Sequence, residues 1–437
     1  MTPNFDTPDH VHRASLHKPK SQAQRAAIGS AVGAVVDWYD FLLYGIVAAL
    51  VFNTAFFPKV SPTMGTLAAF ATFGVGFLFR PLGGIVFGHY GDRLGRKRML
   101  VLTVMLMGLS TVAIGLLPTF ATIGWWAPVL LVTMRAVQGF AVGGEWGGAA
   151  LMAVESAPKG NKAFYSSGVQ VGYGVGLVLA TGFVSLLSHG LGDASFRAWG
   201  WRLPFVFSIV LVAIGLWVRS SMDESSEFVE TVEHRHRKVK LPVIEALTRH
   251  PKAFAYIVAL RLAELFSMYI VTAFALSYST ANLGMSRDLF LNIGLLVGAL
   301  SCVTIPCFAW LADRFGLKRI YLIGAAIGLA SAVPFFVALE ARATVWIVIF
   351  SVLLANVAHD MVVSVQQPLF TELFGAEYRY SGAGVGYQFA SVVGGGFTPF
   401  IAVALTTLAG GSWHLVAGYL AAGCLFSLIV GARMKPE

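Results

Sequence analysis

The stretch Gly91-Asp92-Arg93-Leu94-Gly95-Arg96-Lys97-Arg98 recurs later in the chain as Ala312-Asp313-Arg314-Phe315-Gly316-Leu317-Lys318-Arg319. Each copy directly follows a long apolar stretch. A second matching pair lies farther along each half, and its members are Gly168-Val-Gln-Val-Gly-Tyr173 and Gly382-Ala-Gly-Val-Gly-Tyr387. Both pairs fall at equivalent places in two halves, which indicates a duplicated unit. Parallel repeats of this kind in a membrane protein are a transporter architecture with its binding site between the halves.

The composition shows what each half is built from. Hydrophobic residues make up 57% of the 437 residues and charged residues only 12%, against about 25% charged residues in a typical soluble domain. These values exclude a soluble enzyme, a disordered chain and a nucleic-acid-binding domain. One membrane-crossing helix needs roughly 20 apolar residues. The stretches long enough to cross are 26–52, 65–88, 99–118, 127–155, 164–188, 203–220, 253–279, 288–311, 320–339, 344–366, 381–407 and 414–432.

The predicted fold class is therefore an all-α membrane protein with twelve transmembrane helices in two six-helix parallel repeats. Of the 31 Lys and Arg residues, 23 fall on the side of both termini, 5 on the other side and 3 within spans. By the positive-inside rule, both termini are predicted to be cytoplasmic. The predicted regions are an N-tail at 1–25, a bundle at 26–220, a cytoplasmic loop at 221–252, a second bundle at 253–433 and a C-tail at 434–437.

Few features of the chain point to a bound metal or to enzymatic chemistry. The cysteines Cys302, Cys307 and Cys424 lie in apolar stretches without a C-x-x-C motif, so we expect neither a disulfide nor a zinc site. The net charge of +9 follows from the cytoplasmic loops and requires no nucleic-acid partner. The sequence shows no sizeable aqueous domain, and we predict that the protein is not an enzyme and needs no cofactor.

Several segments together resemble one family. The pattern G-x-x-x-D-R-x-G-R-K-R at 88–98 is similar to the loop 2–3 signature of the major facilitator superfamily. Further segments resemble its metabolite:proton symporters, and the match runs from about residue 26 to residue 433. Those segments are Val36-Asp37-Trp38-Tyr39-Asp40-Phe41, the stretch 135–146, Gly200-Trp-Arg-Leu-Pro204-Phe, Ala358-His359-Asp360-Met361-Val-Val and Gln366-Gln367-Pro368.

The resemblance implies proton-coupled secondary active import by alternating access, with the proton as coupling ion. It favours shikimate, a small ring with one carboxylate and three hydroxyls. Another small organic acid (a dicarboxylate or a quinate-like hydroxy acid) and a zwitterionic osmolyte stay open as alternatives. The tandem halves disfavour a passive channel. The implied location is the bacterial cytoplasmic (inner) membrane, where we expect a monomer whose partners are its substrate, protons and the lipid bilayer.

Ionised side chains inside the predicted spans need a reason, because a charge at mid-bilayer costs about 2.5–3.5 kcal/mol on insertion scales. From a rise of 1.5 Å per residue, Asp37 and Asp40 lie roughly 16 and 21 Å from the cytoplasmic end of their helix. The same estimate gives about 12 Å for Arg80 and about 15 Å for Glu145, with Arg135 close to the level of Asp40. These depths predict a polar cavity between the halves.

An anionic cargo calls for an arginine, because the planar guanidinium can bind both oxygens of a carboxylate. Arg80 is the first choice and Arg135 the second. Arg261 and Glu264, spaced i, i+3, suit a neutralising ion pair as well as a direct role. Neutral side chains that suit hydroxyl groups, or equally well helix–helix hydrogen bonds, are Gln138, Tyr39, Asn356, Tyr387 and Gln388.

Proton coupling requires a group that exchanges a proton during the transport cycle. The proton affinity of an aspartate in a membrane depends on whether a neighbouring arginine is engaged. We predict Asp37 or Asp40 as the proton acceptor, with Arg135 as the switching partner. His359 is the alternative, because imidazole titrates near neutral pH. The remaining proton-coupling candidates are Glu145 and Asp360.

The repeated loop signatures are predicted to be cytoplasmic gates. Asp92, next to Gly91, follows the second span and can accept hydrogen bonds from a neighbouring helix N-terminus, whose dipole adds attraction. In the superfamily that the chain resembles, this motif latches the cytoplasmic side to span 11. Arg93 and Arg96 are expected to pair with Glu155. The counterparts in the second half are Asp313, Arg314 and Glu372.

Overall fold

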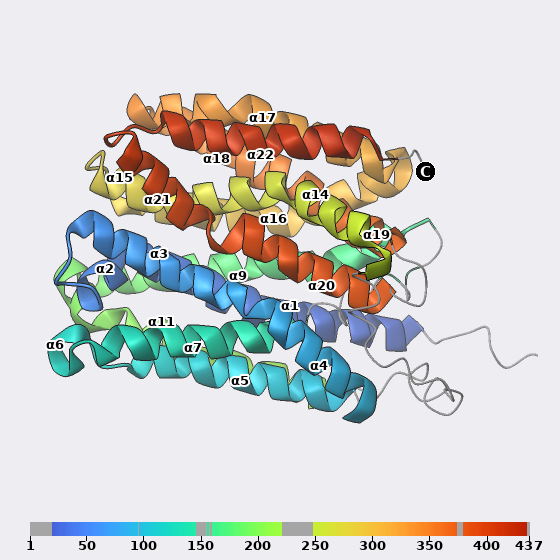
Figure 1. Cartoon of the computed structure of the whole chain (residues 1–437), viewed down its shortest axis with the longest axis horizontal. Helices are drawn as coiled ribbons and strands as arrows, with labels where there is room; N and C mark the ends of the chain where they lie inside the picture. Colours follow the sequence, from blue (N-terminus) through green and yellow to red (C-terminus); the bar gives the residue numbers. More distant parts are fainter. Residues whose placement is uncertain are drawn as a thin grey trace, which may run out of the picture.

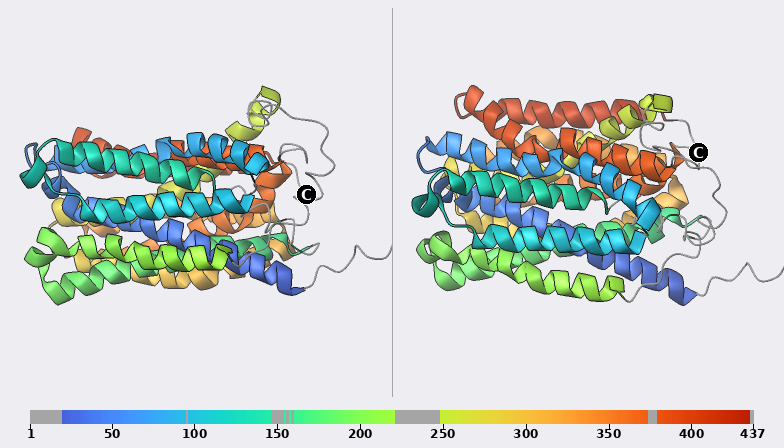
Figure 2. Two further views of the ribbon diagram at one scale, coloured as in Figure 1. Left: turned by 90° about the horizontal axis from the view of Figure 1, so that it is seen from below. Right: turned by 60° about the horizontal axis from the view of Figure 1, so that its bottom comes forward.

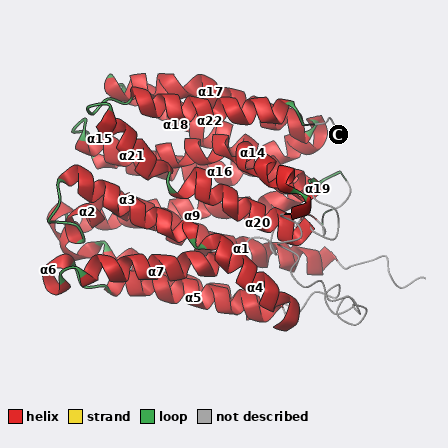
Figure 3. Ribbon diagram, in the orientation of Figure 1, coloured by secondary structure: helices red, strands yellow, loops and turns green. Residues whose placement is uncertain are grey.

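The computed structural model is a bundle of long helices that lie along one common axis, with the loops at its two ends (Figures 1 and 2). Throughout the part of the chain that the structure describes, all regular structure is helical and no strand occurs (Figure 3). This confirms the all-α prediction. The described residues are 20–94, 96–145, 154, 157, 160–220, 248–373 and 379–434.

The helices of the first half gather at the bottom of Figure 1 and those of the second half at the top. The first set comprises α1 (Lys20–Val47), η1 (Ala48–Phe52), α2 (Asn53–Ala55), α3 (Pro62–Leu78), α4 (Arg80–Leu94), α5 (Arg96–Leu116), α6 (Phe120–Ile123), α7 (Trp126–Gly143), α9 (Lys162–Leu191), α10 (Asp193–Ser195), η2 (Phe196–Gly200) and α11 (Arg202–Ser220). The second set comprises α14 (Pro251–Tyr269), η3 (Ile270–Phe274), α15 (Ala275–Ala281), α16 (Arg287–Phe315), α17 (Leu317–Glu340), α18 (Thr344–Val352), η4 (Leu353–Ala358), α19 (His359–Glu372), α20 (Arg379–Ser391), η5 (Val392–Gly396), α21 (Thr398–Leu408) and α22 (His414–Ala432).

Ten described helices, some of them joined end to end, are long and apolar enough to cross a membrane. The bent pair Asp193–Gly200 and Arg202–Val218 raises the number to eleven. The shorter apolar helix Val101–Leu116 falls on the predicted third span. Each predicted span thus coincides in whole or in part with a helix. Helix α1 begins at Lys20, inside the predicted polar tail, because the residues there are good helix formers that extend the helix.

Two kinds of irregularity shape the spans. Span 2 breaks between α3 and α4, where Pro81 lacks the N–H that an unbroken helix would use, and Arg80 stands at the break. The other irregularity is a π-helical turn, which inserts an extra residue into a helix and is frequent at functional sites. Such turns interrupt spans 1, 7, 10 and 11, as η1, η3, η4 and η5.

Helices α9 and α16 come from different halves and pack tightly along the seam between them. A Cβ atom on Gly174 would lie 2.8 Å from the carbonyl oxygen of Gly298, and a Cβ atom on Gly298 would lie 2.8 Å from that of Gly174. Any larger residue at either position would force the two backbones apart, which is why small residues are favoured at such helix contacts. The seam is therefore fixed by direct backbone contact.

Candidate functional site

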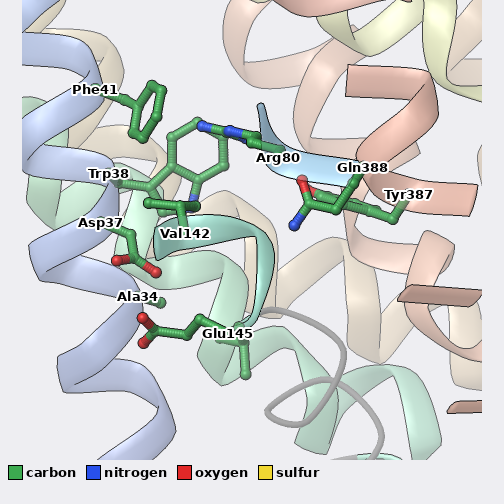
Figure 4. A pocket seen from close by; sticks show the side chains of 10 residues that line it. Ala34, Asp37, Trp38, Phe41, Arg80, Val142, Glu145, Tyr387 and Gln388 are labelled. Atoms are coloured by element: carbon green, nitrogen blue, oxygen red, sulfur yellow. The ribbon is translucent and has the colours of Figure 1, made fainter. Parts of the chain in front are cut away.

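A pocket with an empty volume of about 530 Å³ opens at the seam between the halves (Figure 4). The walls come from α1, α4, α7, α9 and α20, so both halves contribute. The lining residues are Ala34, Asp37, Trp38, Phe41, Arg80, Val142, Glu145, Val169, Tyr387 and Gln388.

Arg80 is the cation of this pocket, and its side chain is held by two aromatic rings. Its guanidinium carbon lies 3.9 Å from the ring centroids of both Phe41 and Phe77. The backbone is fixed as well, because a Cβ atom on Gly143 would lie 1.9 Å from the Arg80 carbonyl oxygen. Among the described residues, the buried Nε of Arg80 has no hydrogen-bond partner. A rigid guanidinium with an unused donor suits an anionic ligand.

Two carboxylates lie across the pocket from the neutral polar side chains. Figure 4 shows Asp37 and Glu145 on one side and Gln388 and Tyr387 on the other. Asp37 and Arg80 are close enough to attract each other electrostatically. The pocket thus combines one guanidinium, two carboxylates, an amide and a phenol, so it can bind an anion that also carries hydroxyl groups.

Asp40 is completely buried and belongs to a chain of hydrogen bonds inside the first half. Its carboxylate accepts hydrogen bonds from the hydroxyls of Thr111 (2.7 Å) and Ser208 (2.9 Å). The Thr111 hydroxyl in turn accepts one from Gln138 Nε2 (2.7 Å), and Gln138 Oε1 accepts one from Arg135 (2.5 Å). Two side chains therefore separate Arg135 from Asp40, one of the two aspartates that the sequence suggested as its partner.

Four predicted ligand residues lie away from the pocket lining, and one of them, Asn356, belongs to the second half. Arg135 is fully buried, with its guanidinium carbon 4.0 Å from the Tyr44 ring centroid. The Tyr39 hydroxyl donates to the carbonyl oxygen of Pro204 (2.7 Å). Gln138 lies within the hydrogen-bond chain to Asp40. The structure places these four side chains in the packing of their own halves, whereas Arg80, Tyr387 and Gln388 reach the pocket.

His359 and Asp360 form a second buried polar cluster, in the second half. His359 Nδ1 lies 2.8 Å from Asp360 Oδ1. The His359 ring packs against Tyr173 of α9, with 4.8 Å between ring centroids, so this cluster touches the opposite half. Neither residue lines the pocket. The groups that donate hydrogen bonds to the other oxygen of Asp360 are the side chains of Ser301, Thr304 and Asn356.

The second loop signature latches onto the opposite half at one end of the seam, where α16 ends and α9 begins. Asp313, near the end of α16, accepts hydrogen bonds from the backbone N–H groups of Ala163 (3.0 Å) and Phe164 (2.9 Å). These N–H groups belong to the first turn of α9, where the helix dipole favours a negative charge. Lys162 of the same turn pairs with Glu372 at 3.2 Å.

The rest of the predicted gate differs from expectation or lies outside the described residues. Arg314 does not pair with Glu372, because its guanidinium lies over the ring of Trp310, one turn earlier on the same helix (4.4 Å). Helix α4 also continues to Leu94, where the sequence suggested a loop. The side chains outside the described part are those of Asp92, Arg93, Arg96 and Glu155, and nothing is described of Gly91 beyond its place in α4.

A cross-half cluster at the opposite end of the seam was not predicted from the sequence. Asp193 bonds to Arg287 of the second half and lies 3.1 Å from Arg197 of the first. His189 lies 3.7 Å from Asp288. Although partial burial opposes it, bonding to Arg197 and Arg287 holds the pKa of Asp193 below its usual value. Arg287 is too distant in sequence from Asp193 for any local pattern to reveal this contact between the halves.

The chain matches one known family over most of its length. The family description "Major Facilitator Superfamily" matches residues 31–399 and again 264–437. This chain belongs to the major facilitator superfamily. The prediction made from the loop signature and the repeats is confirmed.

Similar proteins are transport proteins. The chain is 71% identical over 416 residues to the shikimate transporter of Escherichia coli (strain K12), which covers 95% of both chains. It is 32% identical to the proline/betaine transporter of the same organism, over 94% of this chain and 83% of that protein. A partially occluded inward-open structure of the xylose transporter XylE from E. coli superimposes with a TM-score of 0.76, at 18% identity, covering 95% of this chain and 98% of that one. The last likeness supports the fold.

Proposed function

We propose that this protein imports shikimate across the bacterial inner membrane together with protons, by alternating access, and that it is not an enzyme. The observation that carries the proposal is Arg80, a guanidinium clamped between two rings at the seam with a buried donor unused. The shikimate carboxylate would bind this group. Gln388 and Tyr387, on the opposite wall, would receive ring hydroxyls.

The identity of the cargo is supported by the relatives. The 71% identity to the shikimate transporter extends over nearly the whole chain, whereas the proline/betaine transporter is less than half as similar. The pocket is compatible with this cargo, because Arg80 suits a carboxylate and the neutral side chains of Tyr387 and Gln388 suit hydroxyl groups.

Coupling to protons follows from the charge of the cargo. Importing one anion against 100 mV, negative inside, costs about 2.3 kcal/mol, and one co-moving proton cancels that cost. Asp37 is the proposed proton carrier, because it shares the pocket with Arg80 and interacts with it electrostatically. An anion bound to Arg80 would compete with Asp37 for the same positive charge, which links cargo binding to proton binding.

The experiment that tests the proposal is uptake of radiolabelled shikimate into proteoliposomes under an imposed pH gradient. We expect accumulation above the outside concentration, inhibited by excess unlabelled shikimate and little affected by proline or betaine. Accelerated exchange with internal shikimate identifies a carrier rather than a channel, and recovery of unmodified shikimate excludes an enzyme. Absence of shikimate uptake at any pH gradient would refute the proposal. Protease protection of tagged ends would test the proposed cytoplasmic termini.

Asp313→Asn should lower the maximal rate of shikimate exchange roughly tenfold, because hydrogen bonds to a charged group contribute about 1.5–3 kcal/mol each and the latch to α9 would weaken. Equilibrium binding of shikimate should change less than twofold, since Asp313 is remote from the pocket. Asp288→Asn, at the opposite end of α16, is the matched comparison: it weakens an exposed contact with His189, so its loss of rate should stay below about fivefold and its binding should not change. Equal losses of rate and binding in Asp313→Asn would contradict a latch.

Asp193→Asn should slow uptake by a factor of about 1.4 to 5, the range expected for exposed ion pairs. Its pKa lies below its usual value, so Asp193 stays ionised at neutral and mildly acidic pH. The pairing it supports is present above the ordinary aspartate pKa and is lost only as the pH falls through the lowered one. The ratio of uptake at pH 5.5 to uptake at pH 7.5 should therefore match wild type. A collapse of that ratio would show that the cluster around Asp193 senses the driving protons.

A further inference from the structure

A buried ion pair on α14 lies next to the pocket but outside its lining. Arg261 and Glu264 are each 1% exposed. The guanidinium Nη2 lies 2.6 Å from Glu264 Oε1, and Nε donates to the same oxygen at 2.7 Å. One edge of the guanidinium is thus occupied by the carboxylate. The remaining nitrogen, Nη1, points to another helix.

That nitrogen holds the helix that carries the neutral wall of the pocket. Arg261 Nη1 donates to the carbonyl oxygen of Tyr387 (2.7 Å) and to the hydroxyl of Ser391 (2.6 Å). Ser391 also donates to the Tyr387 carbonyl oxygen, at 2.9 Å. The guanidinium carbon lies 3.4 Å from the Tyr387 ring centroid. Both the backbone and the ring of Tyr387 are therefore fixed by one side chain.

A second contact holds Tyr387 from the opposite half. Its phenol lies close to the side chain of Gln170 of α9. Immediately after Ser391 the helix changes to the π-helical turn η5 (Val392–Gly396), so the anchored segment ends at an irregular one. Arg261 therefore fastens the last regular turn of α20 where Tyr387 and Gln388 face the pocket.

Neutralisation alone does not explain this pair. Taking two charges out of water is costly, and a buried ion pair replaced by apolar residues of similar volume is often neutral or favourable for stability. The feature that an apolar pair would lack is the fork, which binds a carboxylate on one edge and a carbonyl and a hydroxyl on the other. Lysine cannot reproduce it, because its ammonium is a single point of charge.

We propose that Arg261, oriented by Glu264, is a positioning residue that sets Tyr387 and Gln388 for the hydroxyl groups of the substrate. This inference rests on the proposed function, because it assigns the two ends of shikimate to different parts of the pocket. Arg80 recognises the carboxylate. Arg261 acts only through α20 and determines how well the hydroxyl-bearing face is recognised.

The test is equilibrium binding to the purified full-length protein of two ligands, shikimate and cyclohex-1-ene-1-carboxylate, which is the same ring acid without hydroxyls. In Arg261→Lys the affinity for shikimate should fall roughly tenfold, as expected for loss of one or two hydrogen bonds. The affinity for the analogue should change less than twofold. Glu264→Gln should shift the two affinities in the same way, because the carboxylate that orients the guanidinium is lost.

Arg202→Lys is the matched control. Arg202 also donates to backbone carbonyl oxygens, those of Gly115 and Leu117, and lies over the Trp201 ring (4.6 Å), but it is remote from the pocket. It should leave both affinities unchanged. If Arg261→Lys folds poorly, the apolar double variant Arg261→Met with Glu264→Leu replaces it. We expect the same result from this variant, a loss of affinity for shikimate but not for the analogue.

Unchanged shikimate affinity, or equal losses for both ligands, would overturn the positioning role. Wild-type protein that binds neither ligand would instead refute the proposed function, so the two failures are distinguishable.

Discussion

Arg80→Lys is expected to weaken shikimate binding by about 10- to 150-fold, the equivalent of one lost hydrogen bond to a charged group at about 1.5–3 kcal/mol. The lysine keeps the positive charge but cannot present two parallel N–H donors to a carboxylate. It also gives up the double stacking on Phe41 and Phe77, whose centroids both lie 3.9 Å from the guanidinium carbon. Arg80→Gln, which removes the charge as well, should abolish measurable uptake.

Arg135→Lys provides the comparison that separates the two predicted arginines. Arg135 is fully buried and bonded to Gln138, so its replacement should lower the transport rate more than the binding affinity. Binding is measured on purified protein and rate by exchange in proteoliposomes. Strong loss of binding in Arg135→Lys with normal binding in Arg80→Lys would reverse the assignment of the two residues.

The sequence made the fold predictable because its signals are long and repeated. Twelve apolar stretches and two copies of one loop signature leave few arrangements, and the helices fall where those stretches lie. Helix ends were harder to predict. Polar residues at Lys20 and beyond continue α1 out of the apolar region, and α4 runs on through the first loop signature to Leu94. Polarity marks where a membrane ends, whereas a helix ends only where its backbone bonding stops.

The depth of the site residues was predictable, but the direction of their side chains was not. Counting the helical rise put Asp37, Arg80 and Glu145 at similar levels, and all three line the pocket. Arg135 and Gln138 are predicted ligand residues, yet their side chains turn toward Asp40 inside the first half. Which face of a helix meets which neighbour depends on the close contacts made by glycines such as Gly143, and these need the packed structure.

Asp37→Asn should abolish accumulation of shikimate driven by a pH gradient while leaving exchange at equal pH largely intact. With one proton per anion and no net charge moved, a gradient of two pH units supports a ratio of about 100, tenfold per unit. Asparagine cannot take up a proton, so that ratio should fall to about 1. Exchange should persist because the cargo still binds Arg80, which lines the same pocket.

Asp40→Asn is the matched comparison, because Asp40 lies one turn away on α1 but outside the pocket. Its carboxylate accepts hydrogen bonds from both Thr111 and Ser208, and an amide offers only one acceptor oxygen. One hydroxyl would lose its acceptor, so Asp40→Asn should lower both the stability of the protein and its transport rate. The accumulation ratio of shikimate should stay well above 1. Two variants that both retain full accumulation would eliminate these aspartates as proton carriers and leave His359→Gln as the variant to measure. A ratio lost only in Asp40→Asn would place the proton in the hydrogen-bond chain that leads to Arg135, and coupling would then act through the first half rather than through the pocket.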